Sequence, residues 1–322
     1  MVISVLLSTY NGAKYLREQI NSILEQKNVD VDLCIRDDGS KDETLDIIKD
    51  YANNYENVHI VTGGLDGSVG VGRSFMSMLY DLNDEYDYYA FADQDDIWDP
   101  DKLNCAVSSL KKCDNEPSLY VCNQRCVDFK GNFMNKRFPD DFPKQALNNI
   151  LFTNLYAGCT MVFNGRLKEL LCDTDRRPSI DYFQHRIHDA WTACVASSSG
   201  RLIYDPECHM SFRRHNSNAT DAEIRRGKHL GLKKLYLTYK SKFRRLKSRG
   251  YLNRNGIQLT AENLLIGYGD LIDKKSKILL SIVGSYKDSF PNKMKLLFGN
   301  TVKDAVPESR WNIRFKILFN LL

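Results

Sequence analysis

The sequence predicts an α/β fold with a three-layer α/β/α arrangement and a mostly parallel sheet, followed by a basic, mainly helical C-terminal region. Short apolar runs alternate with segments of helical periodicity as far as residue 112, which is typical of a parallel sheet covered on both faces. Beyond residue 218 the strand signals give way to long basic amphipathic segments. Polar clusters follow three of the apolar runs, at the strand ends where ligands of such sheets collect.

Four apolar runs are the expected strands of the first part of the chain. They cover residues 2–7, 31–35, 58–61 and 88–92. Apolar residues recur at helical spacing after each strand, over residues 16–24, 45–52, 75–82 and 103–110. Asp99 and Pro100 are expected to begin the last of these helices as its N-cap and first-turn residues. A strand over 157–163 and a helix over 188–198 are expected in the less regular middle part.

The composition indicates a globular protein of one large or two smaller domains, with 322 residues of which 43% are hydrophobic and 27% charged. Its apolar runs are too short to span a bilayer, and its N-terminus lacks the pattern of a signal peptide. Nine cysteines are scattered without a CxxC pair, and the closest two, Cys122 and Cys126, are four residues apart. We therefore expect reduced thiols in a cytoplasmic protein and no zinc site.

The C-terminal hundred residues carry a concentrated positive charge. Between Arg225 and Arg254 there are twelve lysines or arginines and no acidic residue. The basic segments, including the final stretch RWNIRFKILFNLL, interleave these charges with leucine and aromatic residues, as in helices that lie in an anionic membrane interface. A boundary near residue 222 separates a catalytic domain over 1–222 from a helical region over 223–322 that serves membrane docking or self-association. No motif indicates nucleic-acid binding.

The stretch FADQDDIWDP places several carboxylates at the end of an apolar strand. Like charges this close repel one another unless a cation compensates them. Asp93 and Asp95 fit a hard divalent cation, Mg²⁺ or Mn²⁺, which binds one or two carboxylates together with substrate phosphates. Asp99 is expected to be a helix cap only. For Asp96 both roles, metal ligand and helix cap, are left open.

Two further groups have both a structural and a functional interpretation. Asp37 and Asp38 either stabilise the following helix through its dipole or bind a nucleobase or ribose. The glycine-rich loop over residues 63–72 has neither of the common phosphate-binding signatures, although Arg73 directly behind it can reach an anion. These groups therefore indicate a nucleotide site, but they do not show which of them bind the nucleotide.

Five motifs occur together in one order and at one spacing, namely LLSTYNGAKYL, IRDDGSKDET, FADQDDIWDPDKL, IHDAW and FRRHNSN. With them, the first 218 residues resemble the family 2 inverting glycosyltransferases, which have a GT-A fold. The nearest branch is rhamnosyltransferase-like and builds O-antigen, capsule and other cell-surface polysaccharides. Two positions depart from the family pattern, because Phe212 replaces the usual Tyr and Cys159 replaces the second Gly of a Gly-Gly-Thr sequence.

The resemblance implies a role for each motif. It implies that the donor nucleotide is bound by residues after the first three strands and by an arginine of the last motif, namely Ser8, Thr9, Tyr10, Asp37 or Asp38, Arg73 and Arg213. It implies that Asp93 and Asp95 hold a metal-bound diphosphate, with His215 beside the metal. It also adds Gly158 and Trp191 to the substrate-binding residues.

The resemblance assigns the catalytic base to Asp189. This residue lies about 200° around its helix from Trp191 on the expected buried face, so it projects either into a cleft or simply beside the helix N-terminus. As a base it would accept the proton of an acceptor hydroxyl during attack on the anomeric carbon. His188 either orients Asp189 or is only its neighbour.

The implied function is metal-dependent, inverting transfer of a sugar from a dTDP- or UDP-sugar to a glycan or polyprenyl-linked glycan, at the inner face of the cell membrane. The nearest branch suggests rhamnose as the sugar. Alternatives are a UDP-hexose-using transferase of the same fold, a sugar nucleotidyltransferase and a non-catalytic scaffold that binds sugar nucleotides. The N-terminal region lacks the glycine-rich signature with Arg and Lys that favours a nucleotidyltransferase. A homo-oligomer is left open.

Overall fold

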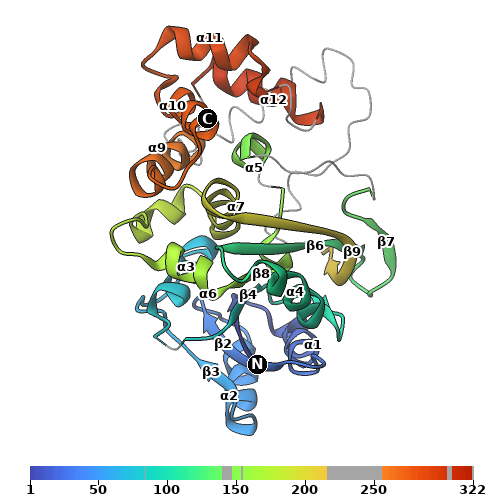
Figure 1. Ribbon diagram of the computed structural model, residues 1–322. Helices are drawn as coiled ribbons and strands as arrows, with labels where there is room; N and C mark the ends of the chain where they lie inside the picture. Colours follow the sequence, from blue (N-terminus) through green and yellow to red (C-terminus); the bar gives the residue numbers. More distant parts are fainter. Residues whose placement is uncertain (84, 140–146, 154, 216–255, 303–306, 321–322) are drawn as a thin grey trace.

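The computed structural model describes residues 1–83, 85–139, 147–153, 155–215, 256–302 and 307–320 (Figure 1). The predicted boundary near residue 222 and the basic segment from 225 to 254 lie outside the described residues, so neither is tested. No helix within the described residues is long and apolar enough to cross a membrane.

A mixed sheet of nine strands runs through the molecule in the order β3-β2-β1-β4-β8-β6-β9-β5, and β7 pairs with β6 outside this path. The strands are β1 (Val2–Thr9), β2 (Asp30–Asp37), β3 (Val58–Ile60), β4 (Tyr88–Ala92), β5 (Ile97–Trp98), β6 (Ser118–Val127), β7 (Phe133–Lys136), β8 (Met161–Asn164) and β9 (Arg201–Arg213). Strands β1 to β4 are mutually parallel, as are β6 and β9, whereas β8 is antiparallel to both of its neighbours. Most paired residues therefore lie in parallel pairs, and the predicted α/β class is confirmed.

Helices cover both faces of this sheet and form the C-terminal end of the chain (Figure 1). The longer ones are α1 (Ala13–Leu24), α2 (Thr44–Asn54), α3 (Val71–Asp81), α4 (Lys102–Leu110), α5 (Leu147–Thr153), α6 (Gly165–Cys172), α7 (His188–Ser199), α9 (Gly256–Tyr268), α10 (Lys274–Ser285), α11 (Phe290–Phe298) and α12 (Pro307–Leu318). Short 3-10 turns are η1 (Lys111–Cys113), η2 (Gly158–Thr160), η3 (Ile180–Gln184) and η5 (Asn300–Val302). The predicted strand over 157–163 therefore begins late, because its first residues form η2.

The start of α4 differs from the prediction. The N-cap position belongs to Asp101, whose side chain makes no capping bond. The carboxylate of Asp99 instead forms an ion pair with Arg125 of β6. The capping role of Asp99 was predicted from local sequence, which carries no information about an arginine on another strand.

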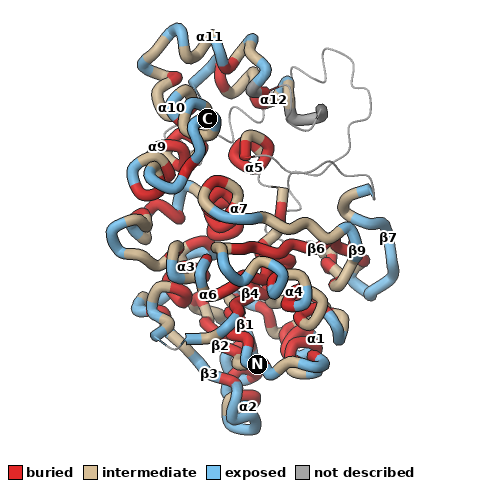
Figure 2. The backbone as a smooth tube through the Cα atoms, viewed as in Figure 1, coloured by how far each residue is buried: buried red, intermediate tan, exposed pale blue. Residues whose placement is uncertain are grey.

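The two faces of the sheet bury separate hydrophobic clusters because side chains alternate along each strand. Leu6 of β1 and Phe91 of β4 belong to one cluster, and Val5 and Ala90 belong to the other. Figure 2 shows the buried residues concentrated along the central strands and α7.

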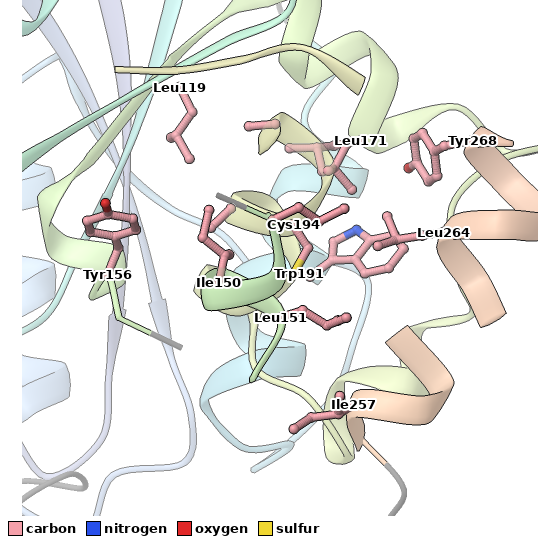
Figure 3. Packing of buried hydrophobic residues seen from close by; sticks show 14 of the residues in the cluster. Leu119, Ile150, Leu151, Tyr156, Leu171, Trp191, Cys194, Ile257, Leu264 and Tyr268 are labelled. Atoms are coloured by element: carbon pink, nitrogen blue, oxygen red, sulfur yellow. The ribbon is translucent and has the colours of Figure 1, made fainter. Parts of the chain in front are cut away.

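Helix α7 is buried on nearly all sides, although the sequence predicted one buried face. The difference arises because α5 and α9 cover the side of α7 that does not face the sheet. Trp191 of α7 is 0% exposed, and its ring centroid lies 5.8 Å from that of Tyr268 in α9 (Figure 3). The described part of the C-terminal region thus shares a hydrophobic cluster with the sheet.

Candidate active site

The carboxyl ends of β1, β2 and β4 lie side by side because the three strands are parallel neighbours. The side chain of Gln94, just beyond β4, joins two of these ends. Its Oε1 accepts hydrogen bonds from Thr9 Oγ1 at 2.6 Å and from Tyr10 N at 2.8 Å. A Cβ at Gly12 would lie 2.3 Å from the same oxygen, so a larger residue there would displace the Gln94 side chain. Sequence reasoning missed Gln94, whose position between two aspartates was its only signal.

Three carboxylates follow β4 and are poorly solvated. Burial, with the nearby carboxylates of Asp95 and Asp189, raises the pKa of Asp93 to about 7. Burial also raises the pKa of Asp95. Asp96 is 0% exposed, and burial together with Asp95 and Asp93 raises its pKa well above the usual range. The predicted electrostatic conflict is therefore present in the fold, and it places Asp93, Asp95 and Asp189 within one electrostatic site.

Strand β9 brings Arg213, and His215 just beyond it, to the same carboxylates. His215 Nε2 lies 2.7 Å from Asp95 Oδ2. Arg213 donates from Nε to Asp95 O at 3.2 Å and from its backbone N to Asp96 Oδ1 at 3.3 Å. Its Nη2 donates to Glu18 Oε2 at 2.5 Å, so this guanidinium also ties α1 to the site.

The donor atoms at this site suit a hard cation. They are carboxylate oxygens and one imidazole, and burial raises the pKa of both carboxyl groups, Asp93 and Asp95. Ligand atoms of Asp93, Asp96 and Cys159 also lie within 4.8 Å of one another. Burial, Asp96 and Asp93 raise the pKa of the Cys159 thiol well above its usual range, and a thiol is a softer ligand than hard cations prefer. The residues therefore fit Mg²⁺ or Mn²⁺ bound mainly through oxygen.

Asp189 lies in the first turn of α7 and is 6% exposed, and its Oδ1 accepts a hydrogen bond from Ala190 N at 2.5 Å. The preceding His188 is wedged between Phe75, with ring centroids 4.0 Å apart, and Phe91, at 4.9 Å. Neither of its ring nitrogens has a hydrogen-bond partner among the described residues. Burial lowers the pKa of His188 to about 3, so the ring is neutral at physiological pH. It packs the start of α7.

Gly158 leaves room for the imidazole of His188. A Cβ at this position would lie 2.3 Å from His188 Nε2, so the absence of a side chain lets the imidazole pack against η2. The predicted contact of Gly158 with substrate stays a prediction, and the structure shows a packing reason for the glycine.

The two acidic residues after β2 organise loops. Asp37 accepts hydrogen bonds from the backbone N of Gly39 at 3.0 Å and of Ser40 at 2.9 Å. Asp38 accepts from Arg36 Nη1 at 2.6 Å and from the backbone N of residues 69 and 70, at 2.8 and 2.9 Å. Burial opposes ionisation of Asp38, but these hydrogen bonds outweigh it and lower its pKa.

Arg36 anchors the glycine-rich loop from beneath. It is buried and donates to the carbonyl oxygens of residues 62, 65 and 67 at 2.7, 3.1 and 3.0 Å. Its Nη1 also donates to Ser74 Oγ at 3.1 Å, and Ser74 lies 2.6 Å from Ser8 Oγ. Sequence reasoning missed Arg36, because a single arginine inside a strand carries no motif.

A cavity of about 360 Å³ lies between the glycine-rich loop and the start of α7, lined by Ser68, Val69, Gly70, Val71, Gly72, Arg73, Phe183, Gln184 and Ile187. Arg73 Nη2 lies 3.4 Å from Asp181 Oδ1 at its edge. Trp191 is buried, as predicted for its helix face, and packs against Tyr268 of α9 (Figure 3). Its predicted contact with substrate stays a prediction.

Comparison with known proteins identifies the family of the chain. The model of the family described as glycosyl transferase family 2 matches residues 4–171, which is more than half of the chain. The chain belongs to this family. The enzyme is therefore a glycosyltransferase, and the matched region contains the ends of β1, β2 and β4 with their polar loops.

The names of individual relatives agree with the assignment to this family. The glycosyltransferase is 29% identical over 248 residues to the dTDP-rhamnosyl transferase RfbG of Shigella flexneri, covering 74% of this chain and 78% of the relative. It is 28% identical over 192 residues to the abequosyltransferase RfbV of Salmonella typhimurium, covering 56% of each chain. Among solved structures, S. aureus TarS 1-349 in complex with UDP-GlcNAc superposes with a TM-score of 0.59 at 16% identity, covering 100% of this chain and 82% of that one. This last likeness supports the GT-A fold alone.

Proposed function

We propose that this glycosyltransferase is metal-dependent and inverting, and that it moves a sugar from a nucleoside-diphosphate sugar to a hydroxyl of a glycan or lipid-linked glycan during cell-surface polysaccharide synthesis. The observation that carries the proposal is the convergence of Asp93, Asp95, Asp189 and His215 at the end of β4. The first donor to test is dTDP-rhamnose, because a relative covering most of the chain is named a dTDP-rhamnosyl transferase.

In this proposal the donor nucleotide lies across the ends of β1 and β2. Thr9 and Tyr10 are fixed by Gln94, and Ser8 is fixed by Ser74, so this part of the site is preorganised. The hydrogen bonds of Asp37 and Asp38 hold the loops that form the walls for the base and ribose. A divalent cation at Asp93, Asp95 and His215 supplies charge stabilisation for the departing diphosphate.

Asp189 acts as the general base. Its carboxylate accepts the proton of the acceptor hydroxyl as the oxygen forms a bond to the anomeric carbon and the bond from that carbon to the diphosphate oxygen breaks. Attack opposite the leaving group inverts the anomeric configuration, and the nucleoside diphosphate leaves with the bonding electron pair. The cavity beside Arg73 and Ile187 adjoins the start of α7, so it is our candidate for the acceptor approach.

We also propose that residues 1–222 form the catalytic domain and residues 223–322 a helical region that docks on the cytoplasmic face of the membrane. Phe290, Phe298 and Trp311 are between 72% and 76% exposed, on α11 with two lysines and on α12 with two arginines and a lysine. Exposed aromatic side chains among basic ones favour an anionic lipid interface. Vesicle binding and sedimentation of the enzyme test this docking. Self-association without vesicle binding would show that the region is an interface between copies of the chain.

The function is tested by incubating the enzyme with Mg²⁺ or Mn²⁺, a panel of dTDP-, UDP- and GDP-sugars and extracted lipid-linked glycans. We expect release of nucleoside diphosphate that requires both metal and acceptor, strongest with dTDP-rhamnose. Turnover with a UDP-hexose alone would support the proposed reaction but show that the donor is a UDP-hexose and not dTDP-rhamnose. Pyrophosphate formation from a sugar phosphate and a nucleoside triphosphate, or donor binding without turnover, would overturn the proposal.

A further inference from the structure

A second group of metal-binding side chains lies between α4 and β9 and shares no residue with the candidate active site. Asp101 and Cys105 are four residues apart at the start of α4, on one face of the helix, and His209 approaches them from β9. Their ligand atoms all lie within 4.8 Å of one another. His209 Nδ1 lies 3.7 Å from Asp101 Oδ1.

The imidazole of His209 is held in a defined orientation from its other side. His209 Nε2 lies 3.3 Å from Asp205 Oδ2, and that oxygen accepts a hydrogen bond from Tyr120 OH at 2.7 Å. A carboxylate that binds one ring nitrogen fixes the tautomer and aims the other nitrogen, which is the usual support of a metal-binding histidine. Here the nitrogen so aimed is Nδ1, beside Asp101 and Cys105.

We propose that Asp101, Cys105 and His209 bind a zinc ion. A thiolate, an imidazole and a carboxylate form a ligand set for a borderline-soft cation, whereas Mg²⁺ and Mn²⁺ prefer the oxygen-rich site after β4. In a tetrahedral zinc site the ligand atoms are about 3.3–3.8 Å apart, so the present separations require only small side-chain movements. Asp101 is exposed and the other two are partly exposed, so the ion has an entry path and water completes its coordination.

The proposed zinc site lies at the junction of β5, α4 and β9. Strand β5, directly before α4, pairs with β9, and Asp99 N donates to His209 O at 3.0 Å. A zinc ion would add a cross-link at this junction, on the strand that leads to Arg213 and His215. The cysteine spacing had led us to expect no zinc site, because a local pattern does not record a third ligand from a strand about a hundred residues away.

The test is a titration of the metal-depleted, reduced full-length enzyme with Co²⁺, a spectroscopic substitute for Zn²⁺. We expect one equivalent to produce a thiolate-to-cobalt charge-transfer absorption, which an equivalent of Zn²⁺ removes. The absorption should disappear in Cys105→Ser and persist in the matched control Cys208→Ser, whose cysteine is the sequence neighbour of His209. Asp205→Asn should keep the absorption and weaken binding by about 10–100-fold.

Thermal unfolding supplies a second readout. Zn²⁺ should raise the unfolding temperature of the wild type and of Cys208→Ser but not of Cys105→Ser, because a ligand that binds only the folded state stabilises it. His209→Gln provides the same comparison if Cys105→Ser does not fold. The proposal is overturned if wild type shows no thiolate absorption. It is also overturned if the absorption survives in Cys105→Ser and is lost in Cys159→Ser, which would assign it to the cluster after β4.

Discussion

His215 and Asp95 are 120 residues apart in the sequence, and His215 Nε2 lies 2.7 Å from Asp95 Oδ2. The contact is possible because β9 runs parallel to β6 and also pairs with β5, which directly follows the carboxylates after β4. The ring of His215 also packs against Tyr15 of α1, with centroids 4.9 Å apart. Three separate parts of the chain thus fix one imidazole against one carboxylate.

The first prediction concerns metal binding at this contact. His215→Ala should weaken Mn²⁺ binding in the presence of nucleoside diphosphate by at least about tenfold, because it removes a ligand and leaves Asp95 without its neighbour. Isothermal titration measures the change. His185→Ala, at an exposed histidine, is the control and should bind normally. Equal affinity in the two variants would exclude His215 from the metal site.

The second prediction concerns Asp189. Asp189→Asn preserves shape and removes the basic carboxylate, so kcat should fall by about 10²–10⁴-fold while donor affinity stays close to wild type. Turnover and donor titration measured side by side separate the two effects. Substantial residual turnover would show that another group accepts the proton.

The third prediction concerns Gly158. Gly158→Ala places a Cβ 2.3 Å from His188 Nε2, and that ring cannot retreat between Phe75 and Phe91. The unfolding free energy should fall by about 1–3 kcal/mol. Gly165→Ala is a matched control, because its Cβ would meet its nearest neighbour at 3.4 Å. Denaturant unfolding of both variants checks this, and equal stability would refute the steric account.

The fourth prediction concerns pH. The pKa of His188 is about 3 in the folded protein and about 6.5 in the unfolded chain, so the unfolded state binds more protons between these values. Its contribution to stability is therefore complete above about pH 6.5 and is lost as the pH falls below it. Replacing the ring in His188→Leu should flatten the acid limb of the stability profile by up to about 1.4 kcal/mol per pH unit. The same change at exposed His185 should leave the slope unaltered.

Local sequence patterns predicted the first half of the fold well, because β1 to β4 are apolar runs that pair in parallel with helices between them. They also placed Asp93, Asp95 and the loops after β1 and β2 at one sheet edge, which follows from parallel pairing alone. The burial of Trp191 on one face of its helix was predicted, but its packing against Tyr268 of α9 was not, because no local pattern records the approach of α9. Gln94 and Arg36 were missed for a related reason, since their hydrogen bonds join loops that only the assembled sheet brings together.

The measurement that tests the account most directly is anomalous diffraction from crystals grown with Mn²⁺ and dTDP. The account predicts one manganese peak that contacts the carboxylate of Asp95, the imidazole of His215 and the diphosphate, with the nucleotide across the ends of β1 and β2. A nucleotide bound elsewhere, or a manganese peak without contact to Asp95 and the diphosphate, would contradict it.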